Sequence, residues 1–192
     1  MNRREAIERT ALILGYAVSA PAIIGILKGC KAAPELNYKP VFLTVEQATT
    51  AGAVADTIIP RTDTPGAADV GVPSFIDLML KDVYSKEDQT RFLEGLTKFD
   101  EETRKAYGKS FAELEPAQQK EMVKKVHDPA VEFHRQTKGQ RVKPFILMIK
   151  ELTLLGYFTS EPGATQVLQY APVPGAYHGC LPLAEVGKAW AT

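Results

Sequence analysis

The feature that most constrains the fold is a strongly apolar run inside residues 141–156. Its apolar side chains are Phe145, Ile146, Met148, Ile149, Leu152, Leu154 and Leu155. Lys143, Lys150 and Glu151 interrupt the run, which argues against a membrane span. We therefore predict a helix over 141–156 at the centre of the core. The chain has 192 residues, which is enough for one such core and too short for two large domains.

Two shorter helices are predicted ahead of it. Thr44 and Gln47 form a capping-box pattern, in which each side chain satisfies a free N–H at the start of a helix. Apolar residues at helical spacing follow, and Pro60 ends the helix. The segment 60–73 is rich in proline and glycine and is predicted to be a loop. A short helix then covers 74–84.

Two further helices follow from similar signals. Ser85 and Asp88 predict the start of a long helix with a single apolar stripe, which Gly108 ends. Pro116 begins the next helix. This helix is predicted to end before Pro129, because proline lacks the N–H that a helix interior needs.

The C-terminal part differs in composition. Residues 157–192 contain many prolines, glycines and aromatic residues, and no stretch shows convincing strand alternation. We predict an all-α fold, in which a compact multi-helix domain carries a C-terminal extension rich in proline, glycine and aromatic residues on its surface.

The N-terminus has the pattern of an export signal. Arg3 and Arg4 precede an uncharged apolar stretch over 10–27 that is too short and too interrupted by glycine and proline to span a membrane. The arginine pair indicates the twin-arginine route, which exports folded proteins. Asn2 and Ala6 depart from the usual twin-arginine pattern. The alternative is an amphipathic first helix, which the continuous apolar run disfavours.

A lipidation site follows this stretch. Leu27, Gly29 and Cys30 fit a lipobox, in which the cysteine sulfur takes a diacylglycerol, although Lys28 stands where a small residue is usual. Acyl chains of this kind anchor a protein to a membrane. The predicted organisation is an export signal over 1–29, a lipidated N-terminus and tether over 30–43, and a helical domain over 44–192.

The residues show no catalytic constellation. Lys+Arg and Asp+Glu both number 23, and no basic run alternates with aromatic residues, so a nucleic-acid partner is not indicated. His127 and His134 fit no metal motif, and His178 with Cys180 supplies two ligands where a structural zinc needs four. Asp56, inside the first predicted helix, is expected to be half-buried and paired. Arg61 and Arg104 are the candidate partners.

Three stretches together resemble one family. They are ADTIIPRTDTPGAADVGVPSFIDLML (55–80), GYFTSEPGATQVLQY (156–170) and PVPGAYHGC (172–180). They look like the small subunit, subunit 3, of the gluconate 2-dehydrogenase family. The resemblance covers about residues 40–185.

The resemblance implies an accessory role. In such systems a large flavoprotein of the glucose–methanol–choline type carries FAD and oxidises a sugar or polyol. A cytochrome c subunit with haem c often takes the electrons to the membrane. The small subunit carries no cofactor of its own, helps the large subunit to mature and lends it an export signal. The implied location is the periplasm or cell envelope, with a lipid anchor after twin-arginine export.

The aromatic residues of the extension have two interpretations. Tyr157, Phe158, Tyr170 and Tyr177 are candidates for contact with the partner, because aromatic residues supply large contact areas at low entropic cost. Alternatively, they cover the domain's own core helix. Two alternative functions also remain: an enzyme that uses His178, Cys180 or Asp56, and a lipoprotein that binds another envelope component.

Overall fold

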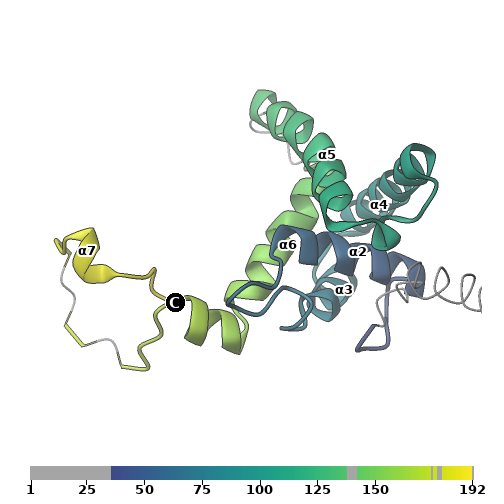
Figure 1. Ribbon diagram of the computed structural model, residues 1–192. Helices are drawn as coiled ribbons and strands as arrows, with labels where there is room; N and C mark the ends of the chain where they lie inside the picture. The colour runs from purple at the N-terminus through teal and green to yellow at the C-terminus, as the bar shows by residue number, and fades with distance from the viewer. Residues whose placement is uncertain (1–35, 138–141, 174, 177–178, 192) are drawn as a thin grey trace, which may run out of the picture. The chain divides into compact units, whose positions relative to one another are not determined.

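Helix α6 (Phe145–Phe158) lies at the centre of the fold, as the apolar run predicts. Ile149 and Leu152 on this helix are almost fully buried. The helices that contact α6 are α2 (Val45–Ile58), α3 (Val72–Asp82), α4 (Lys86–Tyr107) and α5 (Pro116–Gln136) (Figure 1). The core therefore forms where four helices meet a fifth that is apolar on several sides.

The computed structural model describes residues 36–137, 142–173, 175–176 and 179–191. Within these ranges the regular elements are helices, and the β-type pairing is an isolated parallel bridge between Gln169 and Trp190. The predicted all-α class is confirmed. None of the helices in this part of the chain is long and apolar enough to cross a membrane.

Local capping sets the ends of α2 and α4 where the sequence predicts them. The Thr44 hydroxyl accepts a hydrogen bond from the Gln47 N–H at 3.2 Å, and the Gln47 side chain accepts one from the Thr44 N–H at 3.0 Å. Ser85 caps the start of α4. Gly108 ends α4 with a φ of 70°, in the left-handed region where glycine is not strained.

Helix α3 begins two residues earlier than predicted. Gly71 has a φ of 81° and turns the chain into the helix, and Pro73 lies in the first turn, where its missing N–H costs nothing. At the other end of α3, the buried Gln89 side chain donates a hydrogen bond to the Leu80 carbonyl at 2.7 Å. This bond joins the end of α3 to the first turn of α4.

Helix α5 runs through Pro129, so the predicted end before that residue is wrong. Proline leaves the Lys125 carbonyl without its intrahelical partner, but both residues are exposed, and water can bind that carbonyl. Met122, Val126 and Ala130 lie four residues apart and pack on the core on both sides of the proline. This packing offsets the cost of an interior proline, about 3 kcal/mol.

The described end of the predicted tether belongs to the helical domain. Leu43 is buried, and Leu36 and Phe42 pack against the core. Asp77 of α3 is 1% exposed. Its carboxylate accepts hydrogen bonds from the N–H groups of Val41, Phe42 and Leu43. These bonds hold residues 41–43 against α3.

The C-terminal extension pairs with itself. The Gln169 N–H donates to the Ala189 carbonyl at 2.8 Å, and the Ala191 N–H donates to the Gln169 carbonyl at 2.9 Å. The turn of π-helix η2 (Gly163–Val167) contacts α6, and the short helix α7 (Leu183–Val186) follows later. Packing of the rest of the extension on the helical domain stays a prediction.

Candidate functional site

A pocket of about 250 Å³ lies between α2, the start of α3 and the segment that precedes α2. Its walls are mostly apolar and include Leu36, Ala53, Pro73 and Ala112. Ala112 belongs to the short 3-10 helix η1 (Phe111–Glu113), and α5 also contributes to the lining. Asp56 of α2 is the charged residue of this lining. The site is therefore an apolar pocket with one carboxylate.

Asp56 is half-buried, as predicted, and the charge of Arg61 acts on it, but neither candidate base forms an ion pair with it. The guanidinium of Arg61 binds Asp69, and that of Arg104 binds Asp100 at 2.7 Å. Asp56 instead accepts a hydrogen bond from the Ala68 N–H at 3.3 Å. Burial raises the pKa of Asp56, and this backbone hydrogen bond opposes the rise.

Two polar side chains of the pocket lining, Tyr38 and Gln119, donate hydrogen bonds to the backbone. The Tyr38 hydroxyl donates to the Pro73 carbonyl at 3.0 Å, and the Gln119 amide donates to the Phe111 carbonyl at 3.1 Å. Sequence reasoning missed Tyr38, because it placed that residue in a tether. A signal was available in the aromatic and apolar residues on both sides of Pro40, which a solvated tether would not need.

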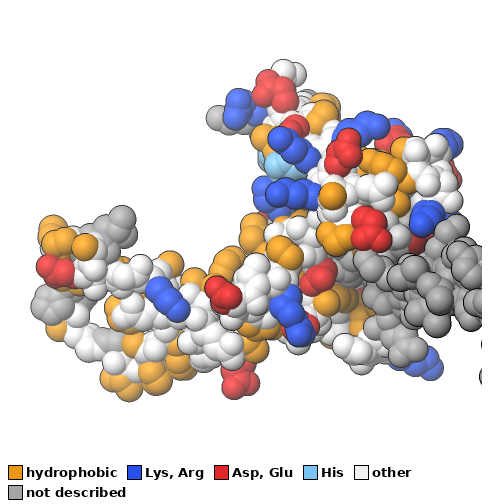
Figure 2. Space-filling model, in the orientation of Figure 1, with side chains coloured by type: hydrophobic (Ala, Val, Ile, Leu, Met, Phe, Trp, Pro, Cys, Tyr) orange, Lys and Arg blue, Asp and Glu red, His pale blue; other side chains and the backbone are white. Residues whose placement is uncertain are grey.

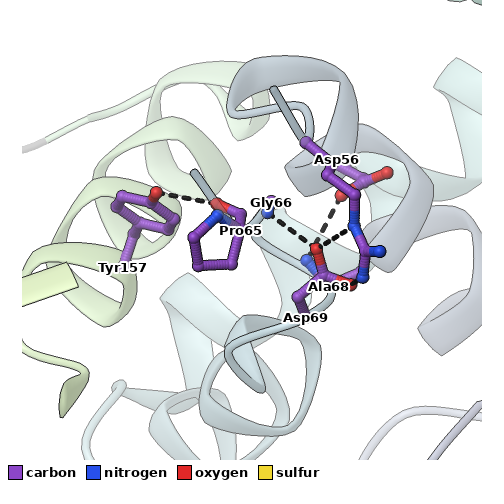
Figure 3. A network of polar contacts seen from close by, with 7 residues as sticks. Asp56, Pro65, Gly66, Ala68, Asp69 and Tyr157 are labelled. Carbon is purple, nitrogen blue, oxygen red and sulfur yellow. Dashed lines mark hydrogen bonds and ion pairs between the residues drawn. The ribbon is translucent and has the colours of Figure 1, made fainter. Parts of the chain in front are cut away.

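The loop between α2 and α3 fixes the position of Asp56 (Figure 3). Arg61 donates to Asp69 through two nitrogens, with Nε at 2.7 Å, and the Gly66 N–H donates to Asp69 at 2.8 Å. The ion pair with Arg61 lowers the pKa of Asp69. A Cβ on Gly66 would lie 2.8 Å from Oδ1 of Asp56, so the loop approaches that carboxylate as closely as glycine allows.

The same loop joins the first two motif stretches in space. The Tyr157 hydroxyl, from α6, donates to the Pro65 carbonyl at 2.7 Å (Figure 3). Gly156 makes room for a ring of α3, because a Cβ there would lie 2.6 Å from Phe75. A Cβ on Gly163 would lie 1.9 Å from the Tyr157 carbonyl oxygen. These glycines serve close packing around Tyr157.

The four predicted partner-contact residues have different surroundings. Tyr157 is 2% exposed, so its ring lies in the chain's own core, as the alternative interpretation holds, and is not offered to a partner. Phe158 is 37% exposed and packs edge-on against Tyr157. Tyr170 is 56% exposed. Tyr177 lies outside the described residues.

One side of α6 carries exposed apolar side chains. Leu154 and Leu155, which were expected in the core, are 38% and 45% exposed. Phe158 and Leu147, which is partly buried against the core, continue this side at helical spacing, and Figure 2 shows hydrophobic side chains along this helix. We call these four residues the α6 apolar face. The sequence signal is that α6 has more apolar residues than one buried stripe needs.

The described histidines and Cys180 form no recognised centre. Lys150 Nζ lies 2.9 Å from His127 Nε2, and His134 Nδ1 is buried without a hydrogen-bond partner. Cys180 is exposed and not in a disulfide, while His178 lies outside the described residues. In the part of the chain that the structure describes, no group of three His, Cys, Asp or Glu residues is placed to hold a metal ion.

The residues of the predicted export signal and lipidation site also lie outside the described part of the chain. These are Arg3, Arg4 and Cys30. The export signal and the lipid anchor therefore stay predictions from the sequence.

The chain matches a protein-family model. No curated protein and no solved structure matches the chain. The family model described as gluconate 2-dehydrogenase subunit 3 matches residues 45–175, which is more than half of the chain and includes α2 to η2. This range holds the loop network, the α6 apolar face and the Asp56 pocket except for its lining residues 36–38. The chain belongs to the gluconate 2-dehydrogenase subunit 3 family.

Proposed function

We propose that the chain is the non-catalytic accessory subunit of a flavin-dependent sugar or polyol dehydrogenase complex in the periplasm or at the membrane. The observation that carries this proposal is the family match over residues 45–175. Membership in a family of dehydrogenase small subunits supports a place in a complex with a catalytic partner. Such a partner is a flavoprotein of the glucose–methanol–choline type that holds FAD, with a haem c cytochrome as a further subunit.

The α6 apolar face supports a role in binding a protein. Leu154, Leu155 and Phe158 are large apolar side chains that the chain's own fold leaves partly exposed. Clustered exposed apolar residues are typical of protein–protein contact. Tyr170 of the extension is also an exposed aromatic residue in the matched range.

The N-terminal pattern supports a role in maturation and export. Arg3 and Arg4 followed by an apolar stretch are typical of a signal that exports folded proteins. Folded export allows flavin to be inserted in the cytoplasm before transport. A small subunit that carries this signal can therefore take a loaded flavoprotein with it, and Cys30 then anchors the complex to the membrane.

Co-purification tests the complex. The full chain is tagged at its C-terminus and recovered from gently solubilised membranes of its own organism. We expect a flavoprotein with FAD absorbance and dye-linked dehydrogenase activity in the same fraction. Recovery of the chain without any flavoprotein would contradict the proposal.

Replacement of Arg3 and Arg4 by lysine tests the export role. We expect both the chain and the partner's activity to stay in the cytoplasm. Arg9→Lys is the matched control, because it makes the same change outside the pair, and it should leave export intact. If the partner still reaches the envelope when the chain does not, the escort role is wrong. That result would not contradict the proposal that the two proteins form a complex.

A further inference from the structure

The Asp56 pocket has the size of a site for one side chain. Its volume is about 250 Å³, whereas pockets for small-molecule ligands usually measure roughly 300–1,000 Å³. Its walls are mostly apolar and include the side-chain carbons of Leu36, Ala53 and Pro73. Walls of this kind suit the aliphatic stem of a long side chain.

The described chain supplies one cation, Arg61, to two carboxylates at this site, Asp56 and Asp69. Asp56 receives one hydrogen bond, from the Ala68 N–H to Oδ1, and no described residue donates to its Oδ2. The guanidinium of Arg61 makes its hydrogen bonds to Asp69 and acts on Asp56 through its charge alone. A half-buried carboxylate that shares a distant cation with a second carboxylate gains free energy when another cation binds it directly.

The carboxylate is also held in place. Gly66 approaches Oδ1 so closely that a Cβ would lie 2.8 Å away, and Asp69 fixes the loop through Arg61 and the Gly66 N–H. A binding group that is already in position loses little entropy when a partner binds. Buried arginines are over-represented among the residues that dominate interface energies, in well-packed pockets of this kind.

From the pocket's volume, apolar walls and single carboxylate, we propose that it receives an arginine side chain of the dehydrogenase's large subunit. This inference rests on the proposed function, which supplies the partner. The stem lies against Ala53 and Pro73, and the guanidinium binds Asp56. The contact adds a polar anchor on a part of the domain that is distinct in sequence from the α6 apolar face.

Co-purification with charge-neutral variants tests the inference. Asp56→Asn keeps the oxygen that accepts from Ala68 but removes the negative charge, and we expect it to reduce the recovered flavoprotein at least tenfold. Asp63→Asn is the matched control, because Asp63 is an exposed residue of the same loop outside the pocket lining. It should recover the flavoprotein as the wild type does.

The outcomes separate the two proposals. Full recovery with Asp56→Asn would overturn the pocket inference and leave the proposed function intact. No flavoprotein with the wild-type chain would overturn the proposed function and, with it, the partner named here.

A small probe tests the chemistry of the pocket in the full chain alone. We expect n-butylguanidinium to shift the amide resonance of Ala68 and to bind at least tenfold more tightly than the uncharged n-butylurea. Ala53→Leu, which fills the pocket without changing its charge, should abolish the shift. Equal binding of the two probes would overturn the inference.

Lys31 lies five residues before Leu36 in the sequence, outside the described residues, and its replacement tests whether the chain provides the cation itself. Lys31→Ala is therefore compared in the same titration. Unchanged probe affinity supports a partner as the source of the cation. A tenfold gain in affinity would show that the chain fills its own pocket, and would overturn the inference.

Discussion

At the residue scale, Asp77 joins the start of the described chain to α3. Its carboxylate accepts three backbone N–H groups, from residues 41–43, and is 1% exposed. Asp77→Ala would leave these donors without an acceptor in a region that is partly closed to water. We expect the free energy of unfolding to fall by about 3 kcal/mol, measured by urea unfolding.

The control for this variant is Asp63→Ala. Asp63 is exposed, and surface substitutions usually change stability by less than about 0.5 kcal/mol. If the two variants lose equal stability, the carboxylate of Asp77 is not the link that the structure indicates.

Tyr38 makes stability depend on alkaline pH. Burial, with a smaller effect from Asp77, raises the pKa of Tyr38 to about 12, whereas an unfolded tyrosine ionises near pH 10. Because the folded chain holds this proton more tightly, the contribution of Tyr38 is complete below pH 10. It is lost as the pH rises from about 10 to about 12.

We expect Tyr38→Phe to flatten this loss when the free energy of unfolding is compared at about pH 9 and about pH 11. Tyr170→Phe is the control, because that ring is 56% exposed, and the slope should not change. A Tyr38→Phe slope equal to that of the wild type would contradict the burial of the hydroxyl.

At the element scale, the contact between α4 and α6 depends on Gly95. A Cβ at this position would lie 2.3 Å from the Cβ of Phe145, so the helices must separate to admit it. Helix propensity alone predicts that Gly95→Ala stabilises the chain by about 1 kcal/mol. We expect the clash with Phe145 to outweigh the gain in helix propensity. The variant should then be less stable by roughly 1–3 kcal/mol, seen as a lower Tm.

The neighbouring Glu94→Ala gives the baseline for this helix. Glu94 is exposed, so its replacement should change Tm little. A higher Tm for Gly95→Ala would show that α4 and α6 do not approach as closely as described.

At the scale of the whole molecule, replacing each of the two cysteines tests whether Cys30 anchors the protein to the membrane. Cys30→Ala should remove a palmitate-analogue label and move the protein from the membrane fraction to the soluble fraction, because more than one acyl chain is needed for stable anchoring. Cys180→Ala should change neither, since Cys180 lies in the C-terminal extension and is free of disulfides. A label that survives Cys30→Ala would contradict lipidation at this residue.

How well the sequence predicts a feature depends on how far apart in the chain the interacting residues lie. The ends of α2 and α4 were predictable, because Thr44, Gln47, Ser85 and Gly108 act within one turn of their own helices. The central place of α6 was predictable from its apolar content. The pairing of Asp56 was not, because Asp69 competes for Arg61 through a loop geometry that no local pattern encodes.

By itself, the sequence determined the all-α class, the central helix and the capped helix ends, because these depend on neighbours along the chain. Only the tertiary structure decided that α5 continues through Pro129, that Tyr157 turns inward to Pro65, and that Leu155 stays exposed. These outcomes depend on contacts between distant segments, where packing and the satisfaction of buried polar groups outweigh local preference.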